Sequence, residues 1–381
     1  HVLFHLDNWE CVSRAIFSIS GVKFSTLYQP LRNPWFDNLI SRWRQRSGVG
    51  LINRHHGFTE ATARLRKGEA VGMLVDQHAG DHGMWIPFFG RLASTTTLPS
   101  LLARRTGAAI IPIFCLSPHA GSVGQRAPLP SQKTRQAGRL PYKPRWRIEF
   151  GAPVTTERRG DGEIMADIHT RLEEAIRRDP AGWFWAHDRW KTPSPNFLLR
   201  SYRRGIHVPP GCRLKPFRLL VRSPNWLGDS VLAIPALRAI RQGRPDCHLT
   251  LLTHPKLAKL WKGQSYVDEV ITSVAEARDK HFDAAILFPN SLRSALEAWF
   301  MGIPRRQGYA GHFRRWLLTA VCPENERAGL RAHDVKDFCG LARWSGAKIE
   351  NEIPVLDLQP THLSPPCPPP AGITSHLSYL V

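Results

Sequence analysis

The sequence predicts an α/β protein of two domains, and three observations support this prediction. At 381 residues the chain is longer than one ordinary domain and suits two. Short apolar runs alternate with amphipathic helical segments through most of its length, which is typical of sheets flanked by helices. A stretch rich in proline and arginine, residues 192–216, interrupts this alternation. We therefore expect domains at residues 1–195 and 217–381, with a linker at 196–216.

The first half contains four apolar runs of strand length, and a helix is expected to start at Glu10. The runs lie at residues 2–6, 69–76, 108–116 and 145–151. Between residues 167 and 178, Ile168, Leu172 and Ile176 recur on one helical face with charged residues opposite. The first domain is therefore expected to combine strands with covering helices.

The second half repeats a regular order of strand and helix. Strands are predicted at residues 217–224, 248–253, 267–272 and 282–289, and helices at 236–242, 256–263 and 291–302. This alternation is typical of a parallel, doubly wound, Rossmann-like sheet. Residues 363–381 contain a proline run and are then expected to open a further helix and strand.

The composition narrows the classes of function. The formal net charge is +21, so the chain should attract phosphorylated substrates, an anionic membrane face or nucleic acid. The basic residues are spread through helices and loops rather than gathered in one stripe, which disfavours nucleic acid. No apolar run approaches the roughly 20 residues that span a bilayer. Seven cysteines without a C-x-x-C pair indicate neither a zinc site nor a disulfide framework, and so a reducing compartment.

A histidine stands at the end of the first apolar run, five residues ahead of a carboxylate. His5 would end the strand and Glu10 would lie in the turn that enters the helix, so both can meet in one crevice. Glu10 would then hold one imidazole nitrogen and raise the basicity of the other. Such a base can take a proton from a hydroxyl that attacks an ester or thioester. On these residues alone, a partly buried histidine satisfied by nearby backbone is the alternative.

The stretch HLDNWE, residues 5–10, resembles the H-x4-[DE] signature of acyltransferases, and most closely the form found in the lipid A late acyltransferases. Further blocks follow in that family's order, at residues 28–34, 65–80, 86–114 and 183–192. The resemblance covers nearly all of residues 1–195. It implies transfer of an acyl chain from acyl carrier protein to an anionic lipid A precursor.

The resemblance also implies roles for individual residues. His5 would be the general base and Glu10 its partner, while Arg32 would meet a substrate phosphate or the developing oxyanion. The same cleft would be lined by Asn8, Asp76 and Gln77. For Arg32, a solvated arginine beside a turn-forming Asn-Pro is the alternative.

Two positions depart from the family's pattern. Asp7 stands where the family has glycine, which brings a second carboxylate beside His5, and Asp188 stands where it usually has arginine. Either could weaken the site without removing the pair of His5 and Glu10. The stretch DQHAGDHG, residues 76–83, contains possible metal-binding side chains, but its spacing suits a polar loop and we expect no metal.

In the second half, the turn NWLGD follows the first predicted strand. It places Gly228 where the backbone must be small and Asp229 at or near a helix N-terminus. Asp229 is then either an N-cap or a carboxylate at the mouth of a doubly wound sheet, where ligands bind. No G-x-G-x-x-G or G-x4-G-K-[ST] motif accompanies it, so neither a dinucleotide site nor a P-loop is expected.

Residues 222–253 and 282–319 closely resemble the heptosyltransferases of glycosyltransferase family 9. The resemblance implies the first, acceptor-side half of a GT-B fold, with Asp229 as the base that deprotonates an acceptor hydroxyl for attack on ADP-heptose. The cleft would be lined by Asn225, Gly228, Asn290 and Ser291. Phosphate or Kdo carboxylate would be met by Arg305, Arg306 and Arg314. For these arginines a solvated surface is the alternative. We expect the donor-binding half to lie beyond residue 381, so that this chain alone would not transfer heptose.

Together the two resemblances imply a bifunctional protein of lipopolysaccharide assembly at the cytoplasmic face of the bacterial inner membrane. It would be peripheral or anchored by a segment ahead of His1. Its partners would be acyl carrier protein, the anionic lipid and the membrane surface, with no cofactor besides the two substrates. The alternatives are a chain with only one active half, a basic nucleic-acid-binding protein and a catalytically inactive scaffold.

Overall fold

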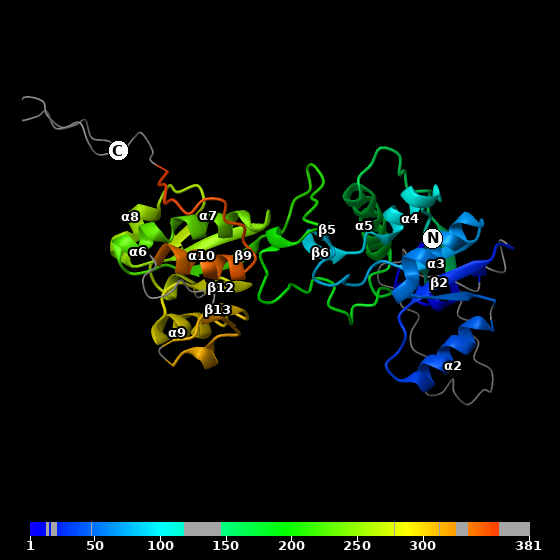
Figure 1. The fold of residues 1–381 in the computed structure, drawn as a ribbon, viewed down its shortest axis with the longest axis horizontal. Coiled ribbons are helices and arrows are strands. Elements are labelled where there is room, and N and C mark those ends of the chain that lie inside the picture. The colour runs from blue at the N-terminus through cyan, green and yellow to red at the C-terminus, as the bar shows by residue number, and fades with distance from the viewer. Residues whose placement is uncertain are drawn as a thin grey trace, which may run out of the picture. The chain divides into compact units, whose positions relative to one another are not determined.

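A computed structural model describes residues 1–12, 15–16, 21–46, 48–117, 146–277, 279–311, 313–324 and 334–357. The chain divides into two compact units, with the division between Pro216 and Phe217 (Figure 1). Unit 1 comprises residues 1–216 with the short stretch 244–246, and unit 2 comprises the remainder. The helix and strand predicted within residues 363–381 lie outside the described residues.

Unit 1 is built on a six-stranded sheet in the order β3-β2-β4-β1-β7-β8. All neighbouring strands run parallel except β8, which is antiparallel to β7. The strands are β1 (Val2–Leu3), β2 (Phe24–Tyr28), β3 (Gly50–Asn53), β4 (Ala70–Leu74), β7 (Pro112–Leu116) and β8 (Arg147–Phe150). The four strands predicted in this half are confirmed as β1, β4, β7 and β8, whereas β2 and β3 were not predicted.

Helices and one hairpin complete unit 1. They are α2 (Pro34–Gln45), η1 (Arg54–His56), α3 (Gly57–Arg66), α4 (Leu98–Thr106), α5 (Asp161–Arg178), η3 (Leu199–Ser201) and the hairpin of β5 (Met84–Phe88) and β6 (Arg91–Thr95). Helix α5 begins six residues before the predicted start at 167, because the Glu163 carboxylate accepts the backbone N–H of Gly160 at 2.7 Å. Its apolar face, which includes Ile168 and Leu172, is buried in the core.

The predicted linker at residues 196–216 is wrong, because this stretch packs as part of unit 1. Leu199 and Tyr202 form a buried cluster with Trp85 and Leu92 of the β5–β6 hairpin. The backbone N–H of Trp85 also donates to the carbonyl of Gly205 at 3.1 Å. Prolines and arginines in this stretch therefore mark irregular but packed backbone rather than a free tether.

Unit 2 contains a six-stranded, entirely parallel sheet in the order β11-β10-β9-β12-β13-β14. Its strands are β9 (Phe217–Arg222), β10 (Cys247–Leu252), β11 (Glu269–Ile271), β12 (Ala284–Leu287), β13 (Arg306–Tyr309) and β14 (Ala320–Cys322). Numbered along the chain this is the order 3-2-1-4-5-6, which is the doubly wound arrangement that the sequence predicted.

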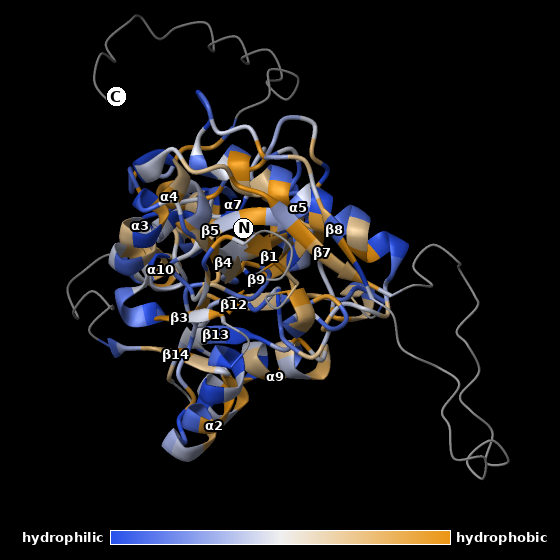
Figure 2. Cartoon of the chain, turned by 90° about the vertical axis from the view of Figure 1, so that its right-hand side faces the viewer, coloured by the Kyte–Doolittle hydropathy of each residue, from blue (hydrophilic) through white to orange (hydrophobic). Residues whose placement is uncertain are grey.

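The helices of unit 2 are short. They are α6 (Leu227–Leu232), α7 (Ile234–Gln242), η4 (Pro255–Leu257), α8 (Ala258–Trp261), η5 (Ala275–Ala277), α9 (Leu292–Phe300), η6 (Arg315–Leu317) and α10 (Asp334–Trp344). Strand β12 is buried along its whole length, because helices cover both faces of a parallel sheet. In unit 1 the central strands β1 and β7 are apolar as well, and Figure 2 shows them in orange. Within the ranges given above, no helix is both long and apolar enough to cross a membrane.

Candidate functional site

The first candidate site lies at the carboxyl ends of β1 and β4. These two strands are parallel neighbours, with Leu3 opposite Leu74. Each strand is followed two residues later by a polar side chain, His5 after β1 and Asp76 after β4. Because parallel strands end at the same edge of a sheet, this register brings two residues that are 71 positions apart into contact.

Asp76 holds the imidazole of His5. Its Oδ1 lies 2.8 Å from His5 Nδ1, and its Oδ2 accepts the backbone N–H of His5 and the indole N–H of Trp183, both at 2.9 Å. The carboxyl is fully buried. Burial alone would raise the pKa of Asp76, but the hydrogen bonds and charge of His5, together with the bond from Trp183, hold it below its ordinary value. Asp76 is therefore an ionised acceptor for three donors.

The second imidazole nitrogen faces Gln77. The amide nitrogen Nε2 of Gln77 lies 3.3 Å from His5 Nε2. An amide nitrogen only donates, so His5 Nε2 is the acceptor and the ring proton sits on Nδ1, against Asp76. Rings of Trp9, Phe184 and His187 lie with their centroids 5.1–6.2 Å from that of His5. This leaves His5 Nε2 in the state that a general base requires.

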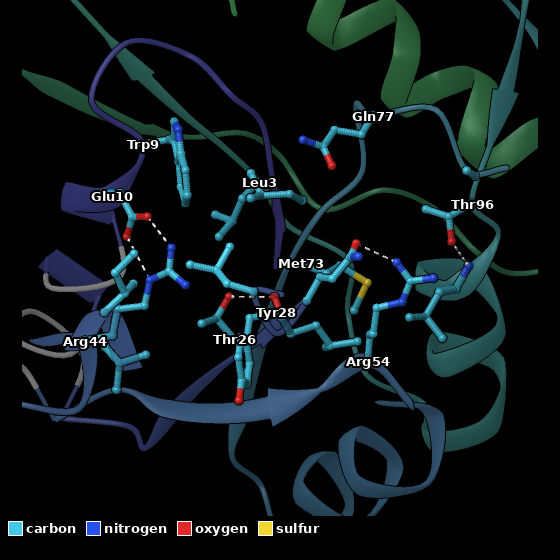
Figure 3. Close-up of a pocket in the computed structure, with 18 of the residues that line it drawn as sticks. Leu3, Trp9, Glu10, Thr26, Tyr28, Arg44, Arg54, Met73, Gln77 and Thr96 are labelled. Atoms are coloured by element: carbon cyan, nitrogen blue, oxygen red, sulfur yellow. Dashed lines mark hydrogen bonds and ion pairs between the residues drawn. The ribbon is translucent and has the colours of Figure 1, made fainter. Parts of the chain in front are cut away.

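Glu10 does not hold the imidazole, which corrects the pairing predicted from the sequence. Its carboxylate forms an ion pair with Arg44 of α2, with 2.5 Å between Glu10 Oε1 and Arg44 Nη2 and 3.3 Å between Oε2 and Nε. Glu10 begins a helical turn that points its side chain toward α2 (Figure 3). The carboxylate beside His5 comes instead from the neighbouring strand. A catalytic role for Glu10 stays a prediction.

A cavity of about 390 Å³ lies beside this pair. Glu10, Arg44, Gln77 and Arg54 line it (Figure 3), and its apolar walls are Leu3, Leu27, Leu31, Ile40, Val49, Met73, Leu74 and Leu98. Arg54 Nη1 donates to the neutral amide oxygen of Gln29 at 2.6 Å. Such a cavity, apolar with a few charged groups at its rim, suits a molecule with an alkyl chain and an anionic head.

The sequence did not single out Arg44 or Arg54. Arg44 lies in an unpredicted helix, and Arg54 follows an unpredicted strand, so neither could be placed at the site. Arg32, which was predicted there, is exposed ahead of α2 and does not line the cavity. The side chain of Asn8 does not line it either, while the Asn8 carbonyl accepts a hydrogen bond from the Cys115 thiol at 3.4 Å.

A buried arginine lies behind the site. Arg189 is fully buried in unit 1, and its guanidinium donates to the carbonyl of Ser94, to Thr95 Oγ1 at 2.9 Å and to His169 Nε2 at 3.1 Å. Burial lowers the pKa of Arg189 to about 10, while the negative charge of Asp76 opposes this shift. Arg189 is therefore a cation at neutral pH, and the negative charge of Asp76 stabilises its protonated form.

His169 is held neutral by the same cluster. Its Nδ1 lies 3.0 Å from the carbonyl oxygen of Pro87, so Nδ1 carries the proton and Nε2 accepts from Arg189. Burial and the charge of Arg189 lower the pKa of His169 to about 3.

This shift predicts acid sensitivity of unit 1. Between about pH 6.5 and 3 the unfolded chain binds a proton at His169 and the folded chain does not, so stability falls as pH drops, by about 1.4 kcal/mol per unit. His169→Gln, which keeps a donor and an acceptor without titrating, should flatten this slope. The free energy of unfolding of unit 1 is measured in urea at several pH values, with hydrogen exchange of the α5 amides as the probe. Equal slopes in the two proteins would exclude His169 as the cause.

The two departures from the family pattern have structural explanations. Asp7 has a φ of 45°, in the left-handed region that favours glycine and that aspartate tolerates better than most residues. Its carboxylate accepts the indole N–H of Trp146 at 3.0 Å. Asp188 is exposed, and the buried arginine of this segment is the next residue, Arg189.

The loop at residues 76–83 is tied to its own neighbours. Gly80 N donates to His78 Nδ1 at 3.1 Å, and His78 Nε2 lies 3.9 Å from Asp81 Oδ1. Among the residues that the structure describes, no three His, Cys, Asp or Glu side chains gather in a way that could hold a metal ion.

The second candidate site lies in unit 2, where the strand order reverses between β9 and β12. Ligands bind at the carboxyl ends of strands at such a switch point. Asp229 in α6 follows β9, and Asn290 and Ser291 follow β12, so the structure brings these three to the same edge. Asp229 is not the N-cap, which corrects that alternative: Trp226 occupies the N-cap position of α6, without a side-chain hydrogen bond there, and Asp229 lies in the first turn. An acidic side chain there is favoured by the helix dipole.

Two buried arginines shape this edge. Arg222, which sequence reasoning missed, ends β9 and donates to Glu297 Oε2 at 2.9 Å and to Asn225 Oδ1 at 3.1 Å. Arg314 donates to Tyr309 O at 2.9 Å and to Ser294 Oγ at 3.0 Å. The available signal for Arg222 was a charged residue directly after the apolar run of Leu219, Leu220 and Val221. Arg314 is fully buried, so the alternative of a solvated surface arginine is wrong for this residue.

Other predicted residues of unit 2 lie elsewhere. Arg305 and Arg306 stand at the amino end of β13, the opposite edge of the sheet from Asp229. The guanidinium of Arg306 donates to the carbonyls of Leu317 and Ile303, so it ties β13 to its neighbours. Gly228 is exposed and a Cβ there would meet no atom within 4 Å, so the expected need for a small residue is wrong.

Comparisons with known proteins identify families that this chain resembles. Residues 1–192, just over half of the chain, match the family model of bacterial lipid A biosynthesis acyltransferases, and residues 272–361 match that of glycosyltransferase family 9, the heptosyltransferases. The lipid A biosynthesis lauroyltransferase of Escherichia coli is 30% identical over 171 residues, covering 44% of this chain and 48% of that protein. Lipopolysaccharide heptosyltransferase 2 of the same organism is 29% identical over 119 residues, covering 27% and 34%.

Among solved structures, the E. coli ADP-heptose lipopolysaccharide heptosyltransferase II is similar with a TM-score of 0.33 and 24% identity, covering 38% of this chain and 47% of that one. The chain spans about a third to a half of the length of the curated relatives it matches. Both matching families are families of transferases. By residues 1–192 the chain belongs to the bacterial lipid A biosynthesis acyltransferases, and its residues 272–361 match glycosyltransferase family 9, the heptosyltransferases.

Proposed function

We propose that unit 1 transfers an acyl chain from acyl carrier protein to a hydroxyl of a lipid A precursor, with His5 as the general base. The observation that carries this proposal is the orientation of His5, whose Nδ1 is held by Asp76 while Nε2 accepts beside the cavity-lining Gln77. The cavity supplies apolar walls for an alkyl chain. The family match supports the lipid substrate.

The chemistry follows from this geometry. His5 Nε2 takes the proton of the acceptor hydroxyl while that oxygen attacks the thioester carbonyl, which gives a tetrahedral oxyanion. Asp76 offsets the charge of the imidazolium that forms. Collapse of the oxyanion breaks the carbon–sulfur bond, and the departing thiolate takes the proton from His5. The products are an ester and a free thiol, and His5 returns to its starting state.

We assign the cationic groups of the cavity to the anionic parts of the substrates. Arg54 is bound to the neutral amide of Gln29 and keeps its positive charge toward the cavity. The ion pair with Glu10 fixes Arg44 in the cavity wall and offsets its charge, while its guanidinium can still donate hydrogen bonds. A phosphate of the lipid or the developing oxyanion would be stabilised there. Arg32 lies outside the cavity and is assigned to the lipid headgroup region.

The kinetic test uses the whole chain with an acyl-loaded acyl carrier protein and a Kdo-lipid A precursor. His5→Ala is expected to lower kcat/KM by about 10²–10⁴-fold, because the base is removed. Glu10→Ala is expected to lower it by about 10²-fold, because Arg44 loses this ion pair. His56→Ala, an exposed histidine of the same unit, is the control and should change little. Equal activity in His5→Ala and wild type would remove His5 as the base.

We further propose that unit 2 is the acceptor-side half of a GT-B heptosyltransferase. The doubly wound strand order, with Asp229, Asn290 and Ser291 at its switch point, supports this assignment. Asp229 would take the proton of the acceptor hydroxyl as it attacks ADP-heptose. Because both donors are cytoplasmic compounds, we place the chain at the cytoplasmic face of the inner membrane.

Calorimetric titration with a Kdo-containing inner-core oligosaccharide tests this second assignment. Asp229→Ala and Asn290→Ala are expected to weaken binding at least about tenfold, which corresponds to one lost charged or polar contact each. Asp279→Ala, at an exposed carboxylate, is the matched control. Binding that is absent in wild type, or unchanged in the variants, would contradict the assignment.

A further inference from the structure

Helix α2 presents its apolar side chains to solvent. No residue of this 12-residue helix is buried. Trp35 is 65% exposed, Phe36 50% and Leu39 52%, and Trp43 is 46% exposed one turn further on. Trp35, Leu39 and Trp43 recur every four residues, and Phe36 lies beside them, so they form one continuous surface, the α2 apolar face. A helix that packs on a core has the opposite arrangement.

The opposite side of α2 faces the rest of unit 1 and the cavity. Asp37, Ile40, Ser41 and Arg44 are the partly buried residues of the helix, and all but Ser41 line the cavity. Asp37 accepts the backbone N–H of Leu31 at 2.9 Å, and Arg44 is held by Glu10. Polar contacts thus fix the inner side, and the α2 apolar face is left outside. Helix α2 contacts β3, and Figure 1 shows the helix at the outside of unit 1.

Arginines border the α2 apolar face. Arg32 precedes the helix, Arg42 lies within it and Arg46 is its C-cap, and all three are exposed. No ion pair to any of them is found within the described parts of the chain. Aromatic and leucine side chains flanked by arginines are typical of helices that lie in the plane of an anionic bilayer, with rings at the headgroup level and guanidinium groups on phosphates.

We propose that α2 docks unit 1 on an anionic lipid bilayer through the α2 apolar face, with Arg32, Arg42 and Arg46 on lipid phosphates. This inference rests on the proposed function, because a lipid acceptor must reach the cavity from a bilayer. Helix α2 is a wall of that cavity on one side and the docking surface on the other. The acceptor would therefore pass from the bilayer to His5 along this helix. Arginines that form no ion pair among the described residues favour an anionic surface over a second copy of this basic chain.

Vesicle flotation of the whole chain tests the proposal without any reaction. Vesicles of phosphatidylcholine with phosphatidylglycerol are compared with phosphatidylcholine alone. Phe36→Glu with Leu39→Glu is expected to lower the partition coefficient for the anionic vesicles at least about tenfold, because two apolar anchors become charged. Phe58→Glu on α3, at a phenylalanine that is 46% exposed, is the matched control and should stay within about twofold.

A second pair of variants tests the arginines. Arg42→Glu with Arg46→Glu is expected to weaken binding to anionic vesicles at least about fivefold per residue, from about 1 kcal/mol for each basic side chain. It should also reduce the salt dependence of binding. Circular dichroism of each variant confirms that the fold is kept, since all four positions are exposed.

The outcomes separate this proposal from the proposed function. Unchanged flotation of the Phe36→Glu, Leu39→Glu variant would overturn docking through α2, even if acyl transfer is observed. Loss of self-association in that variant, measured by light scattering, with unchanged flotation would assign the face to a second copy instead. Reduced flotation supports docking even if no acyl transfer is found. Where transfer is found, the variant should lose activity on acceptor in vesicles and keep it on acceptor in detergent.

Discussion

Replacing Asp76 with asparagine is expected to lower kcat for acyl transfer by about 10³–10⁴-fold while the fold is kept. Asp76 accepts three hydrogen bonds, from the backbone and ring of His5 and from Trp183. An asparagine has only one acceptor atom. It satisfies the backbone and indole donors best by placing its oxygen toward them, and its NH₂ group then faces His5 Nδ1. The ring proton must move to Nε2, and His5 is no longer able to accept a proton from the substrate.

Steady-state kinetics on Asp76→Asn, beside Asp81→Asn as a control, measures this effect. Asp81 lies in the same loop and its side chain is 44% exposed, so its variant should lose less than about threefold. The KM for the acyl donor should change much less than kcat, because Asp76 acts through His5 and is fully buried. Activity of Asp76→Asn within about tenfold of wild type would show that Asp76 does not set the state of His5.

Replacing Arg189 with methionine is expected to destabilise unit 1 by about 3–5 kcal/mol, because three buried acceptors lose their donor at about 1–3 kcal/mol each. The carbonyl of Ser94, Thr95 Oγ1 and His169 Nε2 lose their donor together. Asp76 also loses the nearby positive charge that favours its ionised form. Arg189→Lys should recover only part of this loss, because one ammonium does not reproduce the planar fork of the guanidinium.

The free energy of unfolding of unit 1 is measured for this series in urea, with hydrogen exchange of the α5 amides as the probe. Arg66→Met, at an exposed arginine of α3, is the control and should stay within about 0.5 kcal/mol. A loss of less than about 1 kcal/mol in Arg189→Met would show that water or backbone readily replaces the guanidinium.

Much of the fold could be predicted because buried parallel strands are apolar on both faces. Strand β12 is a continuous run of Ala, Ile and Leu, and β9 has Leu219, Leu220 and Val221 in succession at its centre, which is typical of buried parallel strands. Strands β2 and β3 are short and mix polar with apolar residues, so no period marks them. Helix α2 was missed for a different reason. Its apolar face points outward, which makes its pattern compatible with a loop beside Asn33-Pro34.

The site could be predicted in part. His5 was identified from its place at a strand end, but its partner was taken from sequence proximity to be Glu10. The register of β1 against β4 determines the partner of His5, because it brings Asp76, 71 residues away in the sequence, to the imidazole. A single sequence does not contain that register. Asp7 shows the converse: the glycine that the family pattern has at this position is explained by a φ of 45°.

Mass spectrometry of the lipid product tests the central claim most directly. The whole chain is incubated with an acyl-loaded acyl carrier protein and a Kdo-lipid A precursor, beside folded His5→Ala under the same conditions. We predict that wild type yields a lipid heavier by one acyl chain and that His5→Ala yields at most a trace of it. No acylated lipid from wild type, or equal amounts from the two proteins, would contradict the assignment of His5 and Asp76 as the centre of an acyltransferase.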